Sequence, residues 1–179
     1  MAVVYLHIPY CRHKCVYCDF YSVINKKYIN AFPNIIRKEI EDFISSYQKD
    51  IKISSIFFGG GTPSLMDPKF FLEAIDYIRN KFILESDAEI TIEMNPGTIT
   101  IEKVKEYRRA GINRVSVGVQ SFFDDDLQFM TRIHNSSEAF KAIKMLSDAG
   151  FDNINIDLIF NLPGQTKEKW QQNLNYAID

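Results

Sequence analysis

Strand-like and helix-like segments alternate along the whole chain, and this alternation constrains the fold more than any other feature. Five times, a short apolar run rich in β-branched residues precedes a segment whose apolar residues recur at three- and four-residue steps. Strands that alternate with helices pair in parallel through right-handed crossovers. The sequence therefore predicts an α/β fold with a parallel sheet, either an open doubly wound sheet or part of a barrel.

The hydrophobic period and the capping residues define the expected elements. The expected strands are Ala2–Ile8, Ser54–Phe58, Ala88–Met94, Arg114–Gln120 and Asn153–Phe160. The expected helices are Lys26–Tyr47, Pro68 through Ile78, Thr100 to near Gly111, Ser137–Ala149 and Thr166 to the final residue. Asp67, Thr100 and Thr166 are predicted N-caps, and Gly111 and Gly150 are predicted to end their helices. Pro33 is expected either in the first turn of its helix or at a kink.

The composition limits the classes of partner. A chain of 179 residues with 46% hydrophobic residues can bury a substantial core as one domain. Its 21 basic and 23 acidic residues give a net charge of −2, which argues against a nucleic-acid partner. No apolar run approaches the roughly 20 residues of a membrane span, so we expect no integral membrane segment.

All three cysteines lie within eight residues, directly after the first expected strand. Cys11, Cys15 and Cys18 have the spacing C-x3-C-x2-C, and an odd number of thiols cannot form a fully paired disulfide framework. Clustered free thiols without an export signal predict a cytoplasmic location. Two metal sites fit the spacing. Zinc would need a fourth ligand, such as His7 or His13, whereas a four-iron cluster held by three thiolates keeps one iron open to a ligand.

Polar and small residues stand where the expected strands end. Ligands of parallel α/β folds bind beyond the carboxyl ends of the strands. Those positions carry five features. They are the cysteine segment (Cys11–Cys18), the glycine segment Gly59–Thr62, Glu93, Gln120 and Asp157. Three successive glycines permit close approach of the backbone to a ligand, with N–H groups expected to be free to donate. Asp157 interrupts an apolar strand and must have a polar partner. The sequence predicts a ligand site at this edge.

Several motifs resemble those of known proteins. The C-x3-C-x2-C spacing with Tyr17 before the last cysteine, together with "GGGTP", resembles the radical S-adenosylmethionine (SAM) superfamily. The stretches "YLHIPYCRHKCVYCDFYS", "FFGGGTPS", "IEMNPGT", "NRVSVGVQSF" and "NIDLIFNLPGQT" resemble the oxygen-independent coproporphyrinogen III oxidase family along the whole chain. The resemblance implies a parallel (β/α) barrel of six units followed by a C-terminal domain. Residues 1–179 would be an incomplete radical SAM core of five units, truncated before the sixth strand.

The resemblance also implies two cofactors, a [4Fe–4S] cluster and SAM, and a set of residues for each. The cluster ligands would be Cys11, Cys15 and Cys18. The SAM contacts would be Tyr5, Tyr17, Gly60, Gly61, Thr62, Glu93, Gln120, Arg132 and Asp157. SAM needs an acceptor for its ammonium group, which Glu93 or the glycine backbone can supply, and Arg132 can pair with the methionine carboxylate.

One departure from the family pattern bears on function. In the decarboxylating oxidases a fourth cysteine follows two residues after the third, whereas here Asp19 and Phe20 follow Cys18. That difference matches the branch of haem chaperones, so the resemblance implies a protein that binds haem and passes it to haem-accepting proteins. An electron donor would be a further partner.

The alternative is an oxygen-independent coproporphyrinogen III dehydrogenase that oxidatively decarboxylates a porphyrinogen to protoporphyrinogen IX. A plain electron-transfer or zinc module is the weakest reading. A simple ferredoxin would need a fourth cysteine, and a zinc module would leave the strand-end residues idle.

Overall fold

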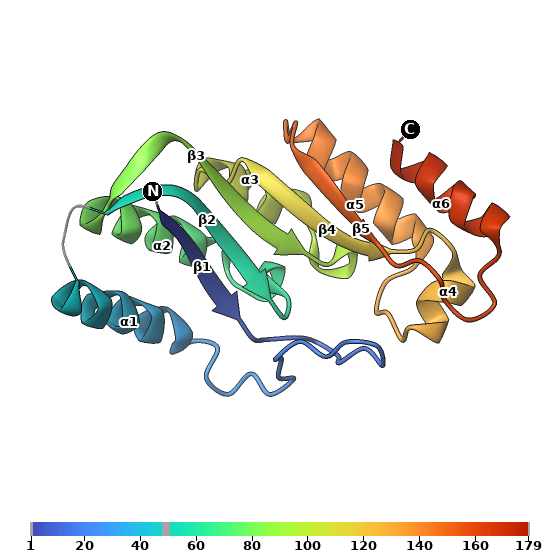
Figure 1. Ribbon diagram of the computed structural model, residues 1–179, viewed down its shortest axis with the longest axis horizontal. Helices are drawn as coiled ribbons and strands as arrows, with labels where there is room; N and C mark the ends of the chain where they lie inside the picture. The colour runs from blue at the N-terminus through green and yellow to red at the C-terminus, as the bar shows by residue number, and fades with distance from the viewer. Residues whose placement is uncertain (1, 48–50, 179) are drawn as a thin grey trace.

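The computed structural model describes residues 2–47 and 51–178, and its strands form one parallel sheet (Figure 1). The strands are β1 (Ala2–Ile8), β2 (Lys52–Gly60), β3 (Ile83–Met94), β4 (Arg114–Gln120) and β5 (Ile154–Leu158). They follow one another across the sheet in chain order, and each neighbouring pair is parallel. A doubly wound sheet reverses its strand order near the middle. The sequential order is that of a partial (β/α) barrel, which confirms the predicted fold class.

Helices cover one face of this sheet. The described helices are α1 (Phe32–Ser46), α2 (Pro68–Lys81), α3 (Ile101–Arg109), α4 (Asp124–Phe129), α5 (Ser136–Asp148) and α6 (Lys167–Ile178), with single 3₁₀ turns at Pro63–Leu65 and Pro96–Thr98. In Figure 1, α2, α3 and α5 lie side by side behind the strands. Within the described ranges, none of these helices has the length and apolar character needed to cross a membrane.

The main core lies between the sheet and these helices. Alternate strand residues, such as Phe58, Ile92 and Val117, are fully buried and face the helix layer. The ring of Phe71 on α2 packs edge-on against Phe58, with centroids 4.9 Å apart, and against Tyr107 on α3, at 5.3 Å. Because side chains alternate along a strand, the residues between these apolar ones point to the opposite face of the sheet. The polar strand residues therefore share that second face.

The predicted caps are confirmed. The side chains of Asp67 and Thr100 each accept a hydrogen bond from a backbone N–H in the first turn of α2 and α3. The Thr166 hydroxyl accepts from the N–H three residues later, at 3.2 Å. Gly111 and Gly150 follow α3 and α5 with φ angles of +94° and +83°, a region that glycine adopts without steric cost.

The structure corrects the bounds of several elements. β2 covers Lys52–Gly60 rather than Ser54–Phe58, β5 covers Ile154–Leu158 rather than Asn153–Phe160, and α2 continues to Lys81 rather than ending at Ile78. The helix expected from Lys26 begins at Phe32, because Pro33 lies in its first turn and its ring would clash with the carbonyl of the preceding turn of a longer helix. β3 begins at Ile83 rather than Ala88, since its first residues pair with the start of β2.

Two further differences concern the C-terminal half of the chain. α4, with three acidic residues in its first turn, was not expected, because six residues are too few to show a helical period. α5 begins at Ser136 rather than Ser137, with Asn135 and Glu138 forming a capping box. The final residue of the last expected helix, Asp179, lies outside the described residues.

Candidate functional site

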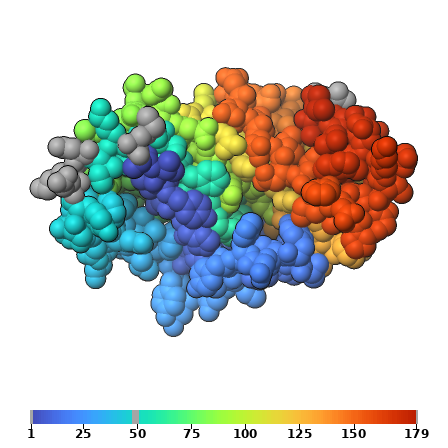
Figure 2. Space-filling view, viewed as in Figure 1, coloured from blue at the N-terminus to red at the C-terminus, as the bar shows by residue number. Residues whose placement is uncertain are grey.

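A large cavity of about 790 Å³ lies at the carboxyl ends of the strands, where the sequence predicts a ligand site. Its wall includes all three cysteines and most of the predicted SAM contacts, namely Tyr17, Gly60, Gly61, Thr62, Glu93, Gln120, Arg132 and Asp157. In Figure 2 the N-terminal strand and cysteine segment, in blue, and the C-terminal part, in orange and red, flank the green and yellow surface of the middle strands. The fold thus gathers residues from all five strand ends around one space.

Tyr5 is the predicted contact that does not line this cavity. It lies within β1 rather than after it, and its ring stacks on Phe57 with centroids 5.9 Å apart. Its hydroxyl lies 3.1 Å from Nδ1 of His7, whose Nε2 in turn contacts the Tyr21 carbonyl at 2.9 Å. Tyr5 therefore supports the base of the cysteine segment through His7, and its predicted contact with SAM stays a prediction.

Backbone hydrogen bonds hold the cysteine segment closed at its base. Val23 N–H donates to the Pro9 carbonyl at 2.7 Å, and Cys11 N–H donates to the Val23 carbonyl at 3.0 Å. Within the loop, Cys18 N–H donates to the Cys15 carbonyl at 3.1 Å. All three thiols are free, and among the described residues no three histidine, cysteine or acidic side chains are gathered at metal-binding distance. The three thiols all line the cavity, but their sulfur atoms are not gathered around one common position.

The glycines bring two segments together. Gly61 N–H donates to the Ile8 carbonyl and Thr62 N–H to the Tyr10 carbonyl, both at 2.8 Å. A Cβ on Gly61 would lie 2.9 Å from backbone atoms of Pro9 and Tyr10, so only glycine permits this approach. The expectation that these N–H groups stay free for a ligand is wrong, because the chain itself takes them up. The close approach of Gly61 to Pro9 and Tyr10 therefore holds the start of the cysteine segment against the end of β2.

Two carboxylates face the cavity from β3 and β5. Glu93 Oε2 accepts a hydrogen bond from Gly60 N–H at 3.0 Å. Burial raises the pKa of the Glu93 carboxyl, the Gly60 N–H opposes that rise, and the nearby charge of Asp157 adds to it. The predicted polar partners of Asp157 are present, since its carboxylate accepts from Ser116 Oγ at 3.1 Å and from Asn155 Nδ2 at 2.7 Å. This wall can accept hydrogen bonds from an ammonium group and from hydroxyl groups.

Arg132 brings a positive charge to the cavity wall, which Arg12 and Lys14 also line. One terminal nitrogen donates to the Gly118 carbonyl at 2.6 Å, and the other lies 3.1 Å from the Tyr17 hydroxyl and 3.8 Å from Cys15 Sγ. Its Nε is buried and has no hydrogen-bond partner in the structure. The guanidinium carries a fixed positive charge at the cavity wall, so this side chain suits an anionic group entering the cavity. Without the resemblance to the radical SAM family, the sequence would predict that Arg132 is an ordinary surface arginine.

Two residues of the site were not singled out from the sequence. Ser116 precedes Gly118 and Gln120 on the same face of β4, and the strict alternation of "SVGVQ" is a signal that could have found it. The Thr131 hydroxyl contacts His13 Nε2 and accepts from Val16 N–H, both at 3.2 Å. No local pattern marks Thr131, because its contacts join segments more than 100 residues apart.

The sequence profile of the Radical SAM superfamily matches residues 5–177, so this chain belongs to that superfamily. Among curated proteins, the chain is 41% identical to the protein named Heme chaperone HemW of Haemophilus influenzae, over 98% of its own length and 47% of that protein's. It is 38% identical to the oxygen-independent coproporphyrinogen III oxidase of Bradyrhizobium diazoefficiens, over 92% of its own length and 37% of the oxidase.

Among solved structures, the chain superposes on coproporphyrinogen III oxidase (HemN) of Escherichia coli, described as a radical SAM enzyme. The TM-score is 0.84 at 28% identity, covering 98% of this chain and 41% of that structure. The chain thus spans about half the length of the curated relatives it matches.

Membership of the superfamily implies a [4Fe–4S] cluster and SAM, and the residues present fit both. The cavity wall offers three free thiols in one loop, and thiolates are the usual ligands of such clusters. The guanidinium of Arg132 and the carboxylates of Glu93 and Asp157 line the same cavity and offer opposite charges for a zwitterionic ligand. A cavity of about 790 Å³ falls within the usual range for sites of small molecules and cofactors.

Proposed function

We propose that this chain is the radical SAM core of a haem chaperone in haem metabolism, with Cys11, Cys15 and Cys18 as the cluster ligands. The observation that carries the choice of branch is the residue two positions after Cys18. Phe20 lines the cavity and is 71% exposed, and it stands where the resemblance places a cysteine in the decarboxylating oxidases. The identity to proteins named as haem chaperones supports the same choice.

The proposed SAM contacts divide by charge. Glu93 accepts hydrogen bonds from the amino group of the methionine moiety, together with carbonyls of the glycine segment. Arg132 pairs with the methionine carboxylate, because a guanidinium forms strong charge-assisted hydrogen bonds with carboxylates. Gln120 and Asp157 lie on neighbouring strands and suit the ribose hydroxyls. Tyr17 offers an aromatic face beside them, and Thr62 offers a hydroxyl, which donates to Cys11 Sγ at 3.5 Å.

A bound cluster would supply an open iron that the amino and carboxylate groups of SAM can chelate and, once an electron donor has reduced it, an electron that can cleave SAM. In a chaperone, the protein that carries this site would also bind haem as its cargo. Its partners would be haem-accepting proteins and an electron donor, and its location would be the cytoplasm. The alternative function is the oxidative decarboxylation of a coproporphyrinogen, which the similarity to the oxidases supports.

Anaerobic reconstitution of the protein, followed by two parallel assays, separates the two functions. In the first assay, which monitors the haem absorbance bands, we expect stable binding of one haem per chain. In the second assay, with SAM and a reductant supplied, we expect no decarboxylation of coproporphyrinogen. A Glu93→Gln variant is the matched control, because it should bind haem as the parent does while its affinity for SAM falls. Formation of protoporphyrinogen IX by the parent would contradict the chaperone proposal and favour the oxidase.

A further inference from the structure

The backbone at the end of β4 is held in an unfavourable conformation. Gln120 has a φ angle of +70°, in the left-handed region that residues other than glycine rarely adopt. The pairing of β4 with β5 changes register between Gly118 and Gln120, and the Gln120 carbonyl accepts from Ile159 N–H at 2.9 Å. Such strain persists only where the surrounding structure enforces it, and it is often found at functional sites. The contacts that enforce it are therefore informative.

The Gln120 side chain lines the cavity. The side-chain nitrogen of Gln120 lies over Gly118, where an added Cβ would come within 2.9 Å of it. The Gly118 carbonyl is also the acceptor for Arg132. Gln120 and Arg132 thus meet above the same glycine, and both line the cavity. A shift of the Gln120 backbone would change the cavity wall at this point.

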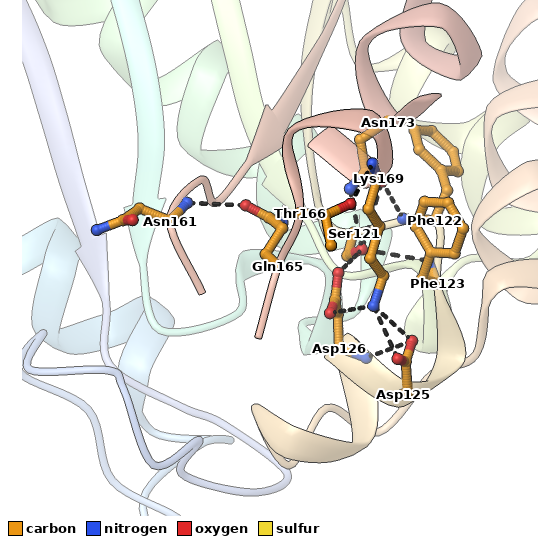
Figure 3. Close-up of polar contacts among 10 residues, drawn as sticks. All are labelled: Ser121, Phe122, Phe123, Asp125, Asp126, Asn161, Gln165, Thr166, Lys169 and Asn173. Atoms are coloured by element: carbon orange, nitrogen blue, oxygen red, sulfur yellow. Dashed lines mark hydrogen bonds and ion pairs between the residues drawn. The ribbon is translucent and has the colours of Figure 1, made fainter. Parts of the chain in front are cut away.

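Asn173, on α6, holds the residues that follow Gln120 (Figure 3). Its Oδ1 accepts from Phe122 N–H at 2.7 Å, and its amide lies 3.3 Å from Ser121 Oγ. Both Ser121 and Asn173 have no exposed surface. Ser121 Oγ donates to Asp126 Oδ2 at 2.7 Å and accepts from Phe123 N–H at 3.2 Å. The chain leaving β4 is thereby bound to α6 by a buried side chain.

A charge cluster fastens α6 to α4 beside this contact. Lys169 Nζ lies 2.6 Å from Asp126 Oδ1 and 2.8 Å from both oxygens of Asp125. The Lys169 side chain is 17% exposed and that of Asp126 only 6%. Both carboxylate oxygens of Asp126 are used, one by Lys169 and one by Ser121 (Figure 3). A buried charge is tolerated only with such partners, so removing one of them would disturb the others.

This cluster differs from the ion pairs on the helix surfaces. Lys144 and Asp148 form a pair within one helix, and both side chains are more than half exposed. Pairs of that kind contribute little to stability. Lys169 instead joins two elements that are 43 residues apart in the chain, and it does so with its charge largely withdrawn from water. The cluster fixes the position of one element against another.

We propose that Asn173, Lys169 and Asp126 are positioning residues that hold the turn after β4 so that Gln120 keeps its left-handed backbone and points into the SAM site. The inference rests on the proposed function, because it takes the ligand of the cavity to be SAM. None of the three lines the cavity. Their effect on the ligand therefore passes through Gln120.

A double-mutant cycle on the affinity for SAM tests this role. The anaerobically reconstituted full chain is compared with Gln120→Ala, Asn173→Ala and the double variant by equilibrium dialysis. We expect each single change to weaken SAM binding about five- to tenfold, the loss of one hydrogen bond. The double variant should bind no more weakly than Gln120→Ala, because the Asn173 effect requires the Gln120 side chain. The melting temperature should fall with Asn173→Ala in both backgrounds.

The control is Asn175→Ala on the same helix, where the exposed side chain accepts a hydrogen bond from Gln171, and SAM binding should be unchanged. If Asn173→Ala fails to fold, the change Lys169→Met with Asp126→Asn enters the same cycle, since it removes the charge pair without leaving a buried charge alone.

Unchanged affinity in these variants, or effects that add in full, would overturn the inference. If the parent chain binds no SAM, the proposed function fails instead.

Discussion

Each of the single substitutions Cys11→Ala, Cys15→Ala and Cys18→Ala should abolish the iron–sulfur cluster of the reconstituted protein. A chain with all three thiols should carry about four irons, and a variant with two should retain almost none, because the cluster would lose one of its three protein ligands. The chain holds no other cysteine that could replace a lost ligand. Iron and sulfide analysis, with the absorbance of the brown protein, measures the loss directly.

His13→Ala is the matched control for these variants. His13 lies in the same loop, where its Nε2 contacts the Thr131 hydroxyl at 3.2 Å, and it is a candidate for the fourth ligand that a zinc site would need. The iron content should be that of the parent. Stoichiometric zinc in the parent, lost on replacement of His13, would instead establish a zinc site and contradict the cluster.

Gly61→Ala should destabilise the protein and displace the cysteine loop. A Cβ at this position would lie 2.9 Å from the Pro9 carbonyl carbon, the Pro9 oxygen and the Tyr10 oxygen. These are backbone atoms at the start of the loop, so they cannot rotate aside as a side chain can. We expect the free energy of unfolding of the cluster-free protein to fall by about 3 kcal/mol, the upper range for an overpacked site. Denaturant unfolding measures this fall, and iron analysis should show reduced cluster loading.

Gly97→Ala provides the comparison. Gly97 also lies in a loop beside the cavity, and its carbonyl accepts a hydrogen bond from Arg12. Its added Cβ would meet its nearest neighbours at 3.5 to 3.6 Å, which is ordinary van der Waals contact. Stability and iron content should stay close to those of the parent. Equal effects of the two substitutions would mean that the close approach at Gly61 is not what holds the loop.

The sheet and the position of the site could be predicted from the sequence because both follow from short-range patterns. The alternation of apolar runs and helical periods defined the strands and most of the helices. Parallel strands end at a common edge, so Glu93, Gln120 and Asp157 were expected together, and the structure brings them around one cavity. Asp157 also has the polar partners that its place in an apolar strand required.

Other features could not be predicted because they depend on contacts between distant segments. The glycine N–H groups were expected to face a ligand, but Gly60 N–H donates to the Glu93 side chain on β3 and Gly61 N–H donates to the Ile8 carbonyl of β1. Both contacts depend on how the strands meet. Asn173 is one polar residue in a helical pattern, and only its contacts with Ser121 and Phe122 give it a role. The left-handed backbone of Gln120 likewise has no signal in the sequence.

The central claim is that this cavity holds a cluster whose open iron binds SAM. The electron paramagnetic resonance spectrum of the reduced, reconstituted protein, recorded with and without SAM, tests it most directly. The amino and carboxylate groups of SAM would change the ligands of one iron, so the account predicts that saturating SAM alters the spectrum of the reduced cluster. A spectrum that is identical with and without SAM, in a protein shown to carry four irons, would contradict the account.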